Sequence, residues 1–201
     1  MARLVMSFWH TVCYWGTRPE EIAAPWPCDD RDRPEESSLF RAIDIDAAPH
    51  TVFRWLCQLK EAPYSYDWLD NRGRTSPRQL TPGADQLAVD QRVMEIFKLV
   101  EFETDRFMTL ITRRDSSLLG SVLVTYQTLP RSISNSISEP AQADQPDEPC
   151  QGTRLIARLR ILYPSGFIGS LAQIGLPFGD WIMMRKQFLT LKGLAEADTK
   201  T

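Results

Sequence analysis

The chain has 201 residues, of which 43% are apolar and 24% charged, and it carries a net charge of −3 at pH 7. This length allows one domain with a buried core, and the composition is that of a globular protein, not a disordered or coiled-coil one. The slightly acidic balance gives no electrostatic reason to expect nucleic acid or an anionic membrane surface as a partner.

The cysteine and histidine content is low. The four cysteines are widely spaced and form no C-x-x-C pair, and the chain contains two histidines. Zinc-type ligand spacing is therefore absent from the sequence, and reduced thiols are expected. We expect no metal and no cofactor.

Two apolar stretches raise the question of a membrane or targeting segment. Residues 1–16 contain His10 and are followed by no A-x-A-like site, so a signal peptide is not predicted. Residues 167–184 contain Gln173, Pro177 and Asp180, which argue against a transmembrane helix. We expect a soluble, cytoplasmic protein without stable membrane insertion.

Residues 1–38 are predicted to form an irregular N-terminal arm, because four prolines and the charge run at 29–36 interrupt them. Dense aromatic residues between positions 8 and 26 predict that this arm packs on the body of the protein, since exposed aromatic clusters are unfavourable. The paired acids of the arm, Glu20-Glu21 and Asp29-Asp30, are expected to be exposed.

The first part of the body is predicted to contain one strand and two helices. Residues 39–46 alternate as a short strand, and apolar residues recur at helical spacing up to Lys60, after Pro49 opens the helix. A second short helix or turn is expected at 66–71. Residues 76–90 contain two prolines and a glycine, which indicates a loop.

From Gln91 the pattern changes to that of strands, predicted at 92–97, 98–102, 107–112 and 120–128. Residues 130–152 contain four prolines and no aromatic residue, and are predicted to be a flexible surface loop. Residues 153–161 alternate cleanly between an apolar face and a face bearing Arg154, Arg158 and Arg160. This arginine face could bind a carboxylate, but a solvated outer sheet face is the preferred interpretation.

The C-terminal region is predicted to be a long helix that breaks near Pro177. Its apolar stripe, which should face the sheet, comprises Trp181, Met184, Phe188, Leu191 and Ala195. Together the elements indicate an α+β protein: a curved antiparallel sheet wrapped around a long C-terminal helix, with two short helices after the first strand. A curved sheet does not close flush on a straight helix, so an internal cavity is expected between them.

Six phrases in the right order resemble the START/polyketide-cyclase-like (SRPBCC, Bet v 1-like helix-grip) superfamily, and in particular a subgroup of uncharacterised bacterial members. They are WGTRPEE (15–21), AIDIDAAPHTVFRWLCQL (42–59), YSYDWL (64–69), LAVDQRV (87–93), TRLIARLR (153–160) and MMRKQFLTLKGLAE (183–196). The resemblance implies a helix-grip domain at 39–197. Asp90 stands where the pattern has glycine, which puts the local turn in doubt.

The resemblance implies a ligand cavity, because the superfamily includes lipid carriers, aromatase/cyclases and hormone receptors. The candidate ligand-binding residues are Trp55, Tyr64, Tyr66, Trp68, Tyr126, Trp181, Met184 and Phe188. For the aromatic residues 64–68, structural packing is slightly the preferred interpretation. Asp67 is expected to cap the short helix, although it could instead accept a ligand hydroxyl. Cys57 is expected to be an inert core thiol.

Three functions follow as hypotheses. The first is binding of a hydrophobic, lipid-like or polycyclic small molecule in the cavity, as a carrier or sequestering protein. The second is a cyclase, dehydratase or hydrolase that uses the same cavity, with Tyr64, Tyr66 or Asp67 as acid/base groups. The third is a partner-binding role for the aromatic arm (8–26), and a homodimer is one possible assembly. No catalytic residue is assigned.

Overall fold

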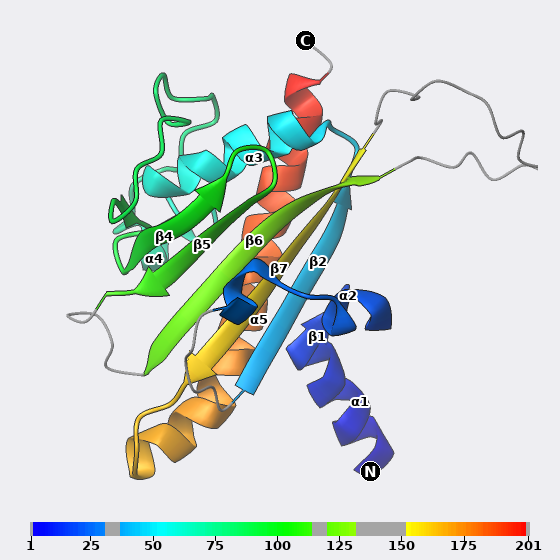
Figure 1. Cartoon of the computed structure of the whole chain (residues 1–201). Helices are drawn as coiled ribbons and strands as arrows, with labels where there is room; N and C mark the ends of the chain where they lie inside the picture. The colour runs from blue at the N-terminus through cyan, green and yellow to red at the C-terminus, as the bar shows by residue number, and fades with distance from the viewer. Residues whose placement is uncertain (1, 31–36, 114–119, 132–151, 200–201) are drawn as a thin grey trace, which may run out of the picture.

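The computed structural model describes residues 2–30, 37–113, 120–131 and 152–199 of the chain (Figure 1). The loop predicted at 130–152 falls almost entirely outside these residues. None of the helices in the described ranges has the length and hydropathy that a membrane span requires.

The described strands form one seven-stranded sheet in the order β1-β2-β7-β6-β5-β4-β3. Neighbouring strands are antiparallel, except that β1 runs parallel to β2. The strands are β1 (Tyr14–Trp15), β2 (Ser37–Ile45), β3 (Arg92–Val93), β4 (Phe97–Glu103), β5 (Phe107–Thr112), β6 (Ser121–Arg131) and β7 (Gly152–Leu162). The two long central strands β6 and β7 pair along their whole length.

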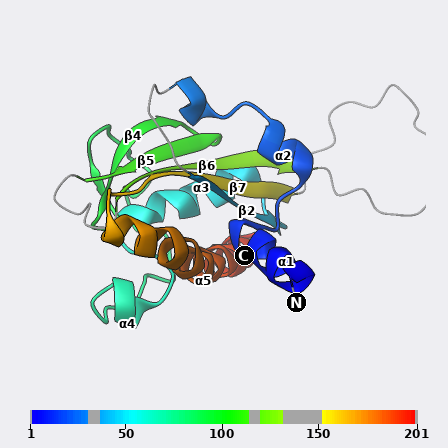
Figure 2. The ribbon, with the colours of Figure 1, turned by 90° about the horizontal axis from the view of Figure 1, so that it is seen from below.

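The helices of the body lie on one face of this sheet (Figure 2). They are α3 (Pro49–Cys57), the 3₁₀ turn η2 (Gln58–Lys60), the short α4 (Asp67–Asp70) and α5 (Phe167–Asp198). The strand, helix and short helix predicted between 39 and 71 are confirmed. A mainly antiparallel sheet packed on a long C-terminal helix, with short helices after β2, is the helix-grip fold that the sequence predicts.

Helix α5 is continuous, so the predicted break near Pro177 is wrong. Proline lacks one backbone donor and usually bends or ends a helix. Here Pro177 is buried, and Gly175 and Gly179 flank it on either side. A Cβ atom added at either glycine would meet nothing within 4 Å, so neither glycine is required for close packing against another element.

The strand predicted at 92–97 is shorter than expected, because β3 ends at Val93. Met94 and Glu95 have φ angles of 47° and 60°, which places both in the left-handed region and turns the chain into β4. Asp90 also has a positive φ, of 67°. The turn expected from glycine is thus kept, because aspartate visits this region more readily than most residues.

The N-terminal arm is not irregular, which corrects the sequence prediction. It contains α1 (Ala2–Cys13), β1, α2 (Pro19–Ala23) and the 3₁₀ turn η1 (Pro27–Asp30). Figure 2 shows α2 on the face of the sheet opposite α5, whereas α1 lies on the α5 side. The arm therefore contributes an edge strand to the sheet and elements to both of its faces.

The arginine face of β7 is covered, so the predicted solvated face is also wrong. Arg154 Nε donates to Glu21 Oε1 at 2.6 Å, and Arg160 donates to the carbonyl of Cys28 at 2.6 Å. Arg158 donates to Asp29 Oδ1 at 2.5 Å and lies over the ring of Phe40. Alternation predicted which residues share the face, but it carried no information on what lies above it.

Two apolar clusters result, one on each face of the sheet. The larger lies between the sheet and helices α3 and α5. The smaller lies under the arm and comprises Trp26, Cys28, Phe40, Ala42, Leu123 and Ile156. The ion pairs that Arg154 and Arg158 form with the arm therefore lie on the same face of the sheet as this second, smaller core.

Candidate functional site

The space between the sheet and α5 is occupied by side chains. Tyr126 of β6 is 2% exposed, and its ring packs against Phe188 of α5 with 6.2 Å between centroids. The Tyr126 hydroxyl donates to Gln187 Oε1 at 3.0 Å, and Gln187 Nε2 donates to the carbonyl of Pro63 at 2.7 Å. Burial raises the pKa of Tyr126 above its usual range.

Tyr126, Gln187 and Phe188 lie in the sheet–helix layer, where the sequence predicts a ligand cavity. Two pockets formed by the described residues both open to solvent. One lies between α4 and α5, and the other lies over α3.

Two further candidates, Trp55 and Tyr64, also belong to the core. Their rings meet edge to face at 6.1 Å, and Trp55 Nε1 donates to Asp198 Oδ2 at 2.9 Å. Tyr64 is buried with a positive φ of 57°, and its hydroxyl has no hydrogen-bond partner among the described residues. Burial raises the pKa of Tyr64 to about 12.

The candidates from α5 divide between core and surface. Met184 and Phe188 are buried against the sheet. Trp181 is half-buried and packs against Phe178 of its own helix and Phe8 of α1, with centroids 5.9 and 6.2 Å apart. Trp181 therefore connects α5 to the N-terminal arm.

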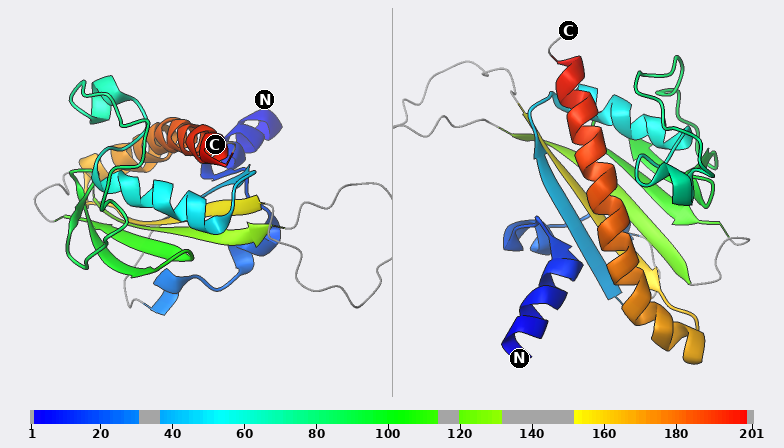
Figure 3. Two further views of the ribbon diagram at one scale, coloured as in Figure 1. Left: turned by 90° about the horizontal axis from the view of Figure 1, so that it is seen from above. Right: turned by 180° about the vertical axis from the view of Figure 1, so that it is seen from behind.

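The remaining candidates, Tyr66 and Trp68, line a groove between α4 and α5. Its volume is about 240 Å³, and its lining is almost wholly apolar. We call it the α4–α5 groove; its lining residues are Tyr66, Trp68, Leu69, Gly179, Ile182 and Met183. Figure 2 and Figure 3 show α4 standing beside α5, away from the sheet.

Hydrogen bonds hold the α4 side of the groove in place. Asp67 accepts the backbone N–H of Ser76 at 2.9 Å and its hydroxyl at 2.5 Å, so it ties α4 to the following loop. The prediction that Asp67 caps the helix is therefore wrong, since α4 has no side-chain cap. Ser65 donates to Asp70, and burial raises the pKa of Asp70. Gly73, at a φ of 76°, lets the chain turn back after α4.

On the α5 side, a missing side chain opens the groove. Gly179 has no Cβ, and one added there would meet nothing within 4 Å. Ile182 and Met183, on the next turn of α5, complete the wall. Sequence reasoning missed these three residues. For Ile182 and Met183, the available signal was that apolar residues surround this part of α5 on more sides than one buried face requires.

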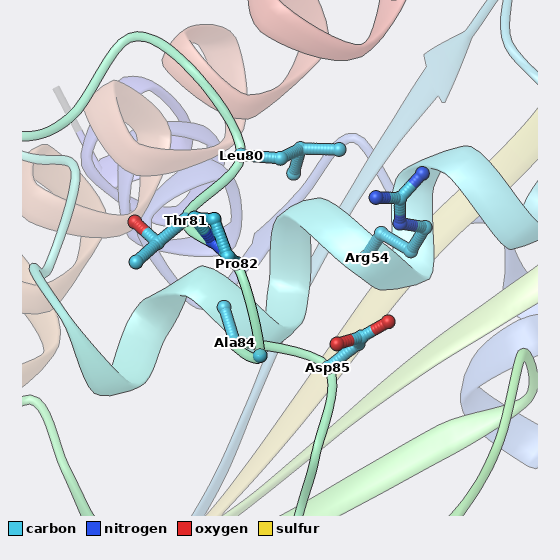
Figure 4. Close-up of a pocket in the computed structure, with 7 residues that line it drawn as sticks. Arg54, Leu80, Thr81, Pro82, Ala84 and Asp85 are labelled. Atoms are coloured by element: carbon cyan, nitrogen blue, oxygen red, sulfur yellow. The ribbon is translucent and has the colours of Figure 1, made fainter.

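The second pocket is more polar and has a volume of about 220 Å³. Loop residues 80–85 close over Arg54 of α3, and Lys60 Nζ holds this loop by donating to the carbonyl of Gly83 at 2.7 Å. Figure 4 shows the Arg54 guanidinium and the Asp85 carboxylate on the same side of this pocket. No candidate from the sequence lies there.

The described residues include no group of three or more His, Cys, Asp or Glu side chains able to hold a metal ion. Burial raises the pKa of the Cys57 thiol to about 12, so it stays protonated and poorly nucleophilic at neutral pH. What the groove offers is an apolar, open surface bordered by aromatic side chains.

No protein-family model matches the chain, and no curated protein matches it significantly. Among solved structures, a Mesorhizobium loti protein is 14% identical with a TM-score of 0.48, over 80% of this chain and 98% of that one. A Thermus thermophilus protein is also 14% identical, with a TM-score of 0.48 over 81% and 99% of the two chains. A mutant of Thalictrum norcoclaurine synthase, bound to a transition-state analogue, is 7% identical with a TM-score of 0.45 over 82% and 96%. Likeness at this level says nothing about ligand or reaction, and the fold assignment rests on the topology above.

Proposed function

We propose that the protein binds an apolar small molecule, such as an acyl chain or a compact ring system, in the α4–α5 groove. The supporting observation is the groove itself: six residues from two elements form an apolar depression whose rim carries two aromatic side chains. Ligand pockets are commonly concave, mostly apolar and lined by aromatic residues. In such a role the protein carries or sequesters its ligand.

The size of the groove limits what it can hold. A volume of about 240 Å³ is just below the ~300–1,000 Å³ of pockets that enclose drug-sized molecules. The ligand should therefore be small, or only one segment of it should be held. Among the described lining residues, the polar side-chain atoms are the Tyr66 hydroxyl and the Trp68 indole N–H, which could orient a polar end group.

An enzyme of the cyclase or dehydratase type has weaker support. Such chemistry needs at least two polar groups converging on the bound substrate. Asp67 is engaged by Ser76, and the Tyr64 hydroxyl lies in the core, so Tyr66 is the one member of that predicted trio that lines the groove. We therefore retain binding as the proposed function.

The domain division is proposed as well: an arm at 1–38 and a helix-grip domain at 39–197. The arm contributes β1 to the sheet edge and covers Phe40 on the outer face. A chain that starts near Ser38 should consequently lose part of its second core, and we expect it to be less stable than the full chain.

The proposed function is tested by ligand extraction and by titration. Native mass spectrometry of the purified full chain, before and after organic extraction, should show a bound apolar molecule that is lost on extraction. Titration with the fluorescent probe N-phenyl-1-naphthylamine should then show one saturable site on the extracted protein.

A matched pair of variants locates this site. Trp68→Ala removes an aromatic residue from the rim and should weaken probe binding at least about fivefold, because an aromatic contact contributes about 1 kcal/mol or more. Trp9→Ala removes an exposed tryptophan of α1 that does not line the groove, and should leave probe binding unchanged. Equal effects of the two variants, or no saturable binding at all, would refute the proposal.

A further inference from the structure

The first half of α5 carries large apolar side chains that face solvent. Phe167 is 84% exposed, Ile174 65% and Leu171 63%. Figure 3 (right) shows α5 running along this side of the molecule with no other drawn element in front of it. We call this surface the uncovered face of α5; its residues are Phe167, Ile168, Leu171, Ile174 and Phe178.

The spacing of these residues makes them one stripe. Phe167, Leu171, Ile174 and Phe178 stand at i, i+4, i+7 and i+11, which is one side of a helix. The opposite side of the same turns, Gly169, Ala172 and Pro177, is buried. Small residues thus face the protein and large ones face water, the reverse of an ordinary surface helix.

Aromatic residues of α1 extend the uncovered face sideways. Phe8 is half exposed and its ring lies 6.5 Å from that of Phe178, centroid to centroid. Trp9 follows it on the same helix and is exposed. Contiguous exposed apolar surface of this kind is typical of sites that meet another protein or a membrane.

The exposed charges of α5 nearest to the uncovered face are both positive. Residues 167–179 contain no charged side chain, and the first acid of α5, Asp180, is turned inward to the fully buried Arg41, 2.7 Å away. The next exposed charges on the helix are Arg185 and Lys186. No other acid occurs on α5 before Glu196.

We propose that the uncovered face of α5 docks on the surface of a lipid bilayer. The stripe from Phe167 to Phe178 is about 17 Å long at 1.5 Å per residue, so α5 can lie in the membrane plane with this side in the acyl boundary. Trp9 and Phe8 would then lie at headgroup depth, where aromatic residues are favoured. Arg185 and Lys186 follow the stripe and would meet anionic headgroups, although the whole chain is net acidic.

A second copy of the chain fits the face less well. In a two-fold dimer the same surface meets itself, so Arg185 and Lys186 would need carboxylates from the same patch. Asp180, the one acid of α5 in that stretch, is already paired with Arg41 on the inner side. A bilayer with anionic lipids supplies both the apolar phase and the negative charge.

This inference goes beyond the proposed function and does not depend on it. Phe167, Leu171 and Ile174 lie outside the α4–α5 groove, so variants there leave its lining intact. Vesicle binding and probe binding are also separate measurements, and either can fail alone.

The test is sedimentation of the full chain with vesicles of phosphatidylcholine alone, or of equal parts phosphatidylcholine and phosphatidylglycerol. We expect binding to both, tighter on the anionic vesicles and weakened there by salt. Leu171→Glu with Ile174→Glu should lower binding to both at least about tenfold, because two apolar side chains can no longer be buried. The control pair, Val89→Glu with Ile96→Glu, changes exposed apolar residues on other elements and should bind as the unmodified chain does.

A second variant tests the positive charges and leaves the apolar stripe unchanged. Arg185→Glu with Lys186→Glu should weaken binding to the anionic vesicles and leave binding to phosphatidylcholine nearly unchanged. The proposal fails if the unmodified chain does not sediment with either vesicle, or if the Leu171/Ile174 variant sediments equally well. A chain that is dimeric by analytical ultracentrifugation, dissociates in that variant and ignores vesicles would assign the face to a second copy.

Discussion

The hydroxyl of Tyr126 on β6 donates a hydrogen bond to Gln187 Oε1 on α5 at 3.0 Å, in the middle of the layer between sheet and helix. Gln187 in turn donates to the carbonyl of Pro63, which precedes α4. This short chain of polar contacts joins the sheet, α5 and the segment leading to α4. It lies in the sheet–helix layer, whereas the α4–α5 groove of the proposed function opens to solvent.

Two tyrosine-to-phenylalanine variants should separate the roles of the buried hydroxyls. Tyr126→Phe should lower the free energy of unfolding by about 1–3 kcal/mol, because it leaves the buried Gln187 oxygen without its donor. Tyr64→Phe should be neutral or slightly stabilising, since the Tyr64 hydroxyl has no partner among the described residues. Urea unfolding at neutral pH measures both. If Tyr64→Phe cost as much as Tyr126→Phe, the Tyr64 hydroxyl would have a role in folding that these contacts do not provide.

The ion pair between Glu21 and Arg154 should make the attachment of the arm depend on pH. Burial alone raises the pKa of Glu21, but hydrogen bonds from Arg154 and the Arg18 backbone outweigh it, so the pKa is lowered from its usual 4.5. The unfolded chain therefore binds the proton more tightly, and the pair stabilises the fold above about pH 4.5 but not below the lowered pKa. Glu21→Gln should cost about 2 kcal/mol at pH 7.

The measurement is thermal unfolding of this variant and the unmodified chain across an acid series. The gap between their midpoints should narrow as the pH falls below 4.5. Glu20→Gln is the matched control, because Glu20 is exposed and should show almost no gap. A gap that stays constant down to acid pH would mean that the Glu21 charge does not stabilise the arm.

The pair Arg41–Asp180 should behave as a coupled unit. Arg41→Met leaves the Asp180 carboxylate without its cation and should cost about 3–5 kcal/mol at pH 7. Burial already raises the pKa of Asp180 against the opposing effect of Arg41. Without Arg41 the pKa of Asp180 should rise further. As the pH is lowered and Asp180 takes up a proton, the variant's loss of unfolding free energy should therefore become smaller.

A double-mutant cycle checks this coupling. Arg41→Met combined with Asp180→Leu should be more stable than the sum of the two single changes predicts, because neither charge is then left alone. Additive single effects would show that the two side chains act independently despite their 2.7 Å contact.

Sequence patterns predicted the secondary-structure elements that have one regular apolar side. Residues 49–60 have a single apolar stripe, and the helix α3 with its 3₁₀ extension buries Val52, Phe53 and Leu56 as expected. The alternation at 153–161 predicted the strand and its apolar side, although the arm also covers the opposite side.

The same patterns could not reveal what covers a surface. The arginines of β7 look like a solvated face until Glu21 and Asp29 of the arm are placed above them, and those acids are far away in sequence. The groove residue Gly179 gave no signal either, because a glycine contributes a space only once α4 stands beside it. Tertiary placement, not local propensity, determined both.

The binding proposal depends on the open space at Gly179. Gly179→Leu adds a side chain to the groove wall and should weaken binding of N-phenyl-1-naphthylamine at least about tenfold, because the new side chain occupies the volume of the ligand. Gly175→Leu makes the same exchange one turn earlier on α5, outside the groove lining, and should bind the probe as the unmodified chain does. We expect both variants to fold, because leucine favours the helix and a Cβ at either position meets nothing within 4 Å. Selective loss of binding in Gly179→Leu is the predicted result, and equal binding by the two variants would contradict a ligand site between α4 and α5.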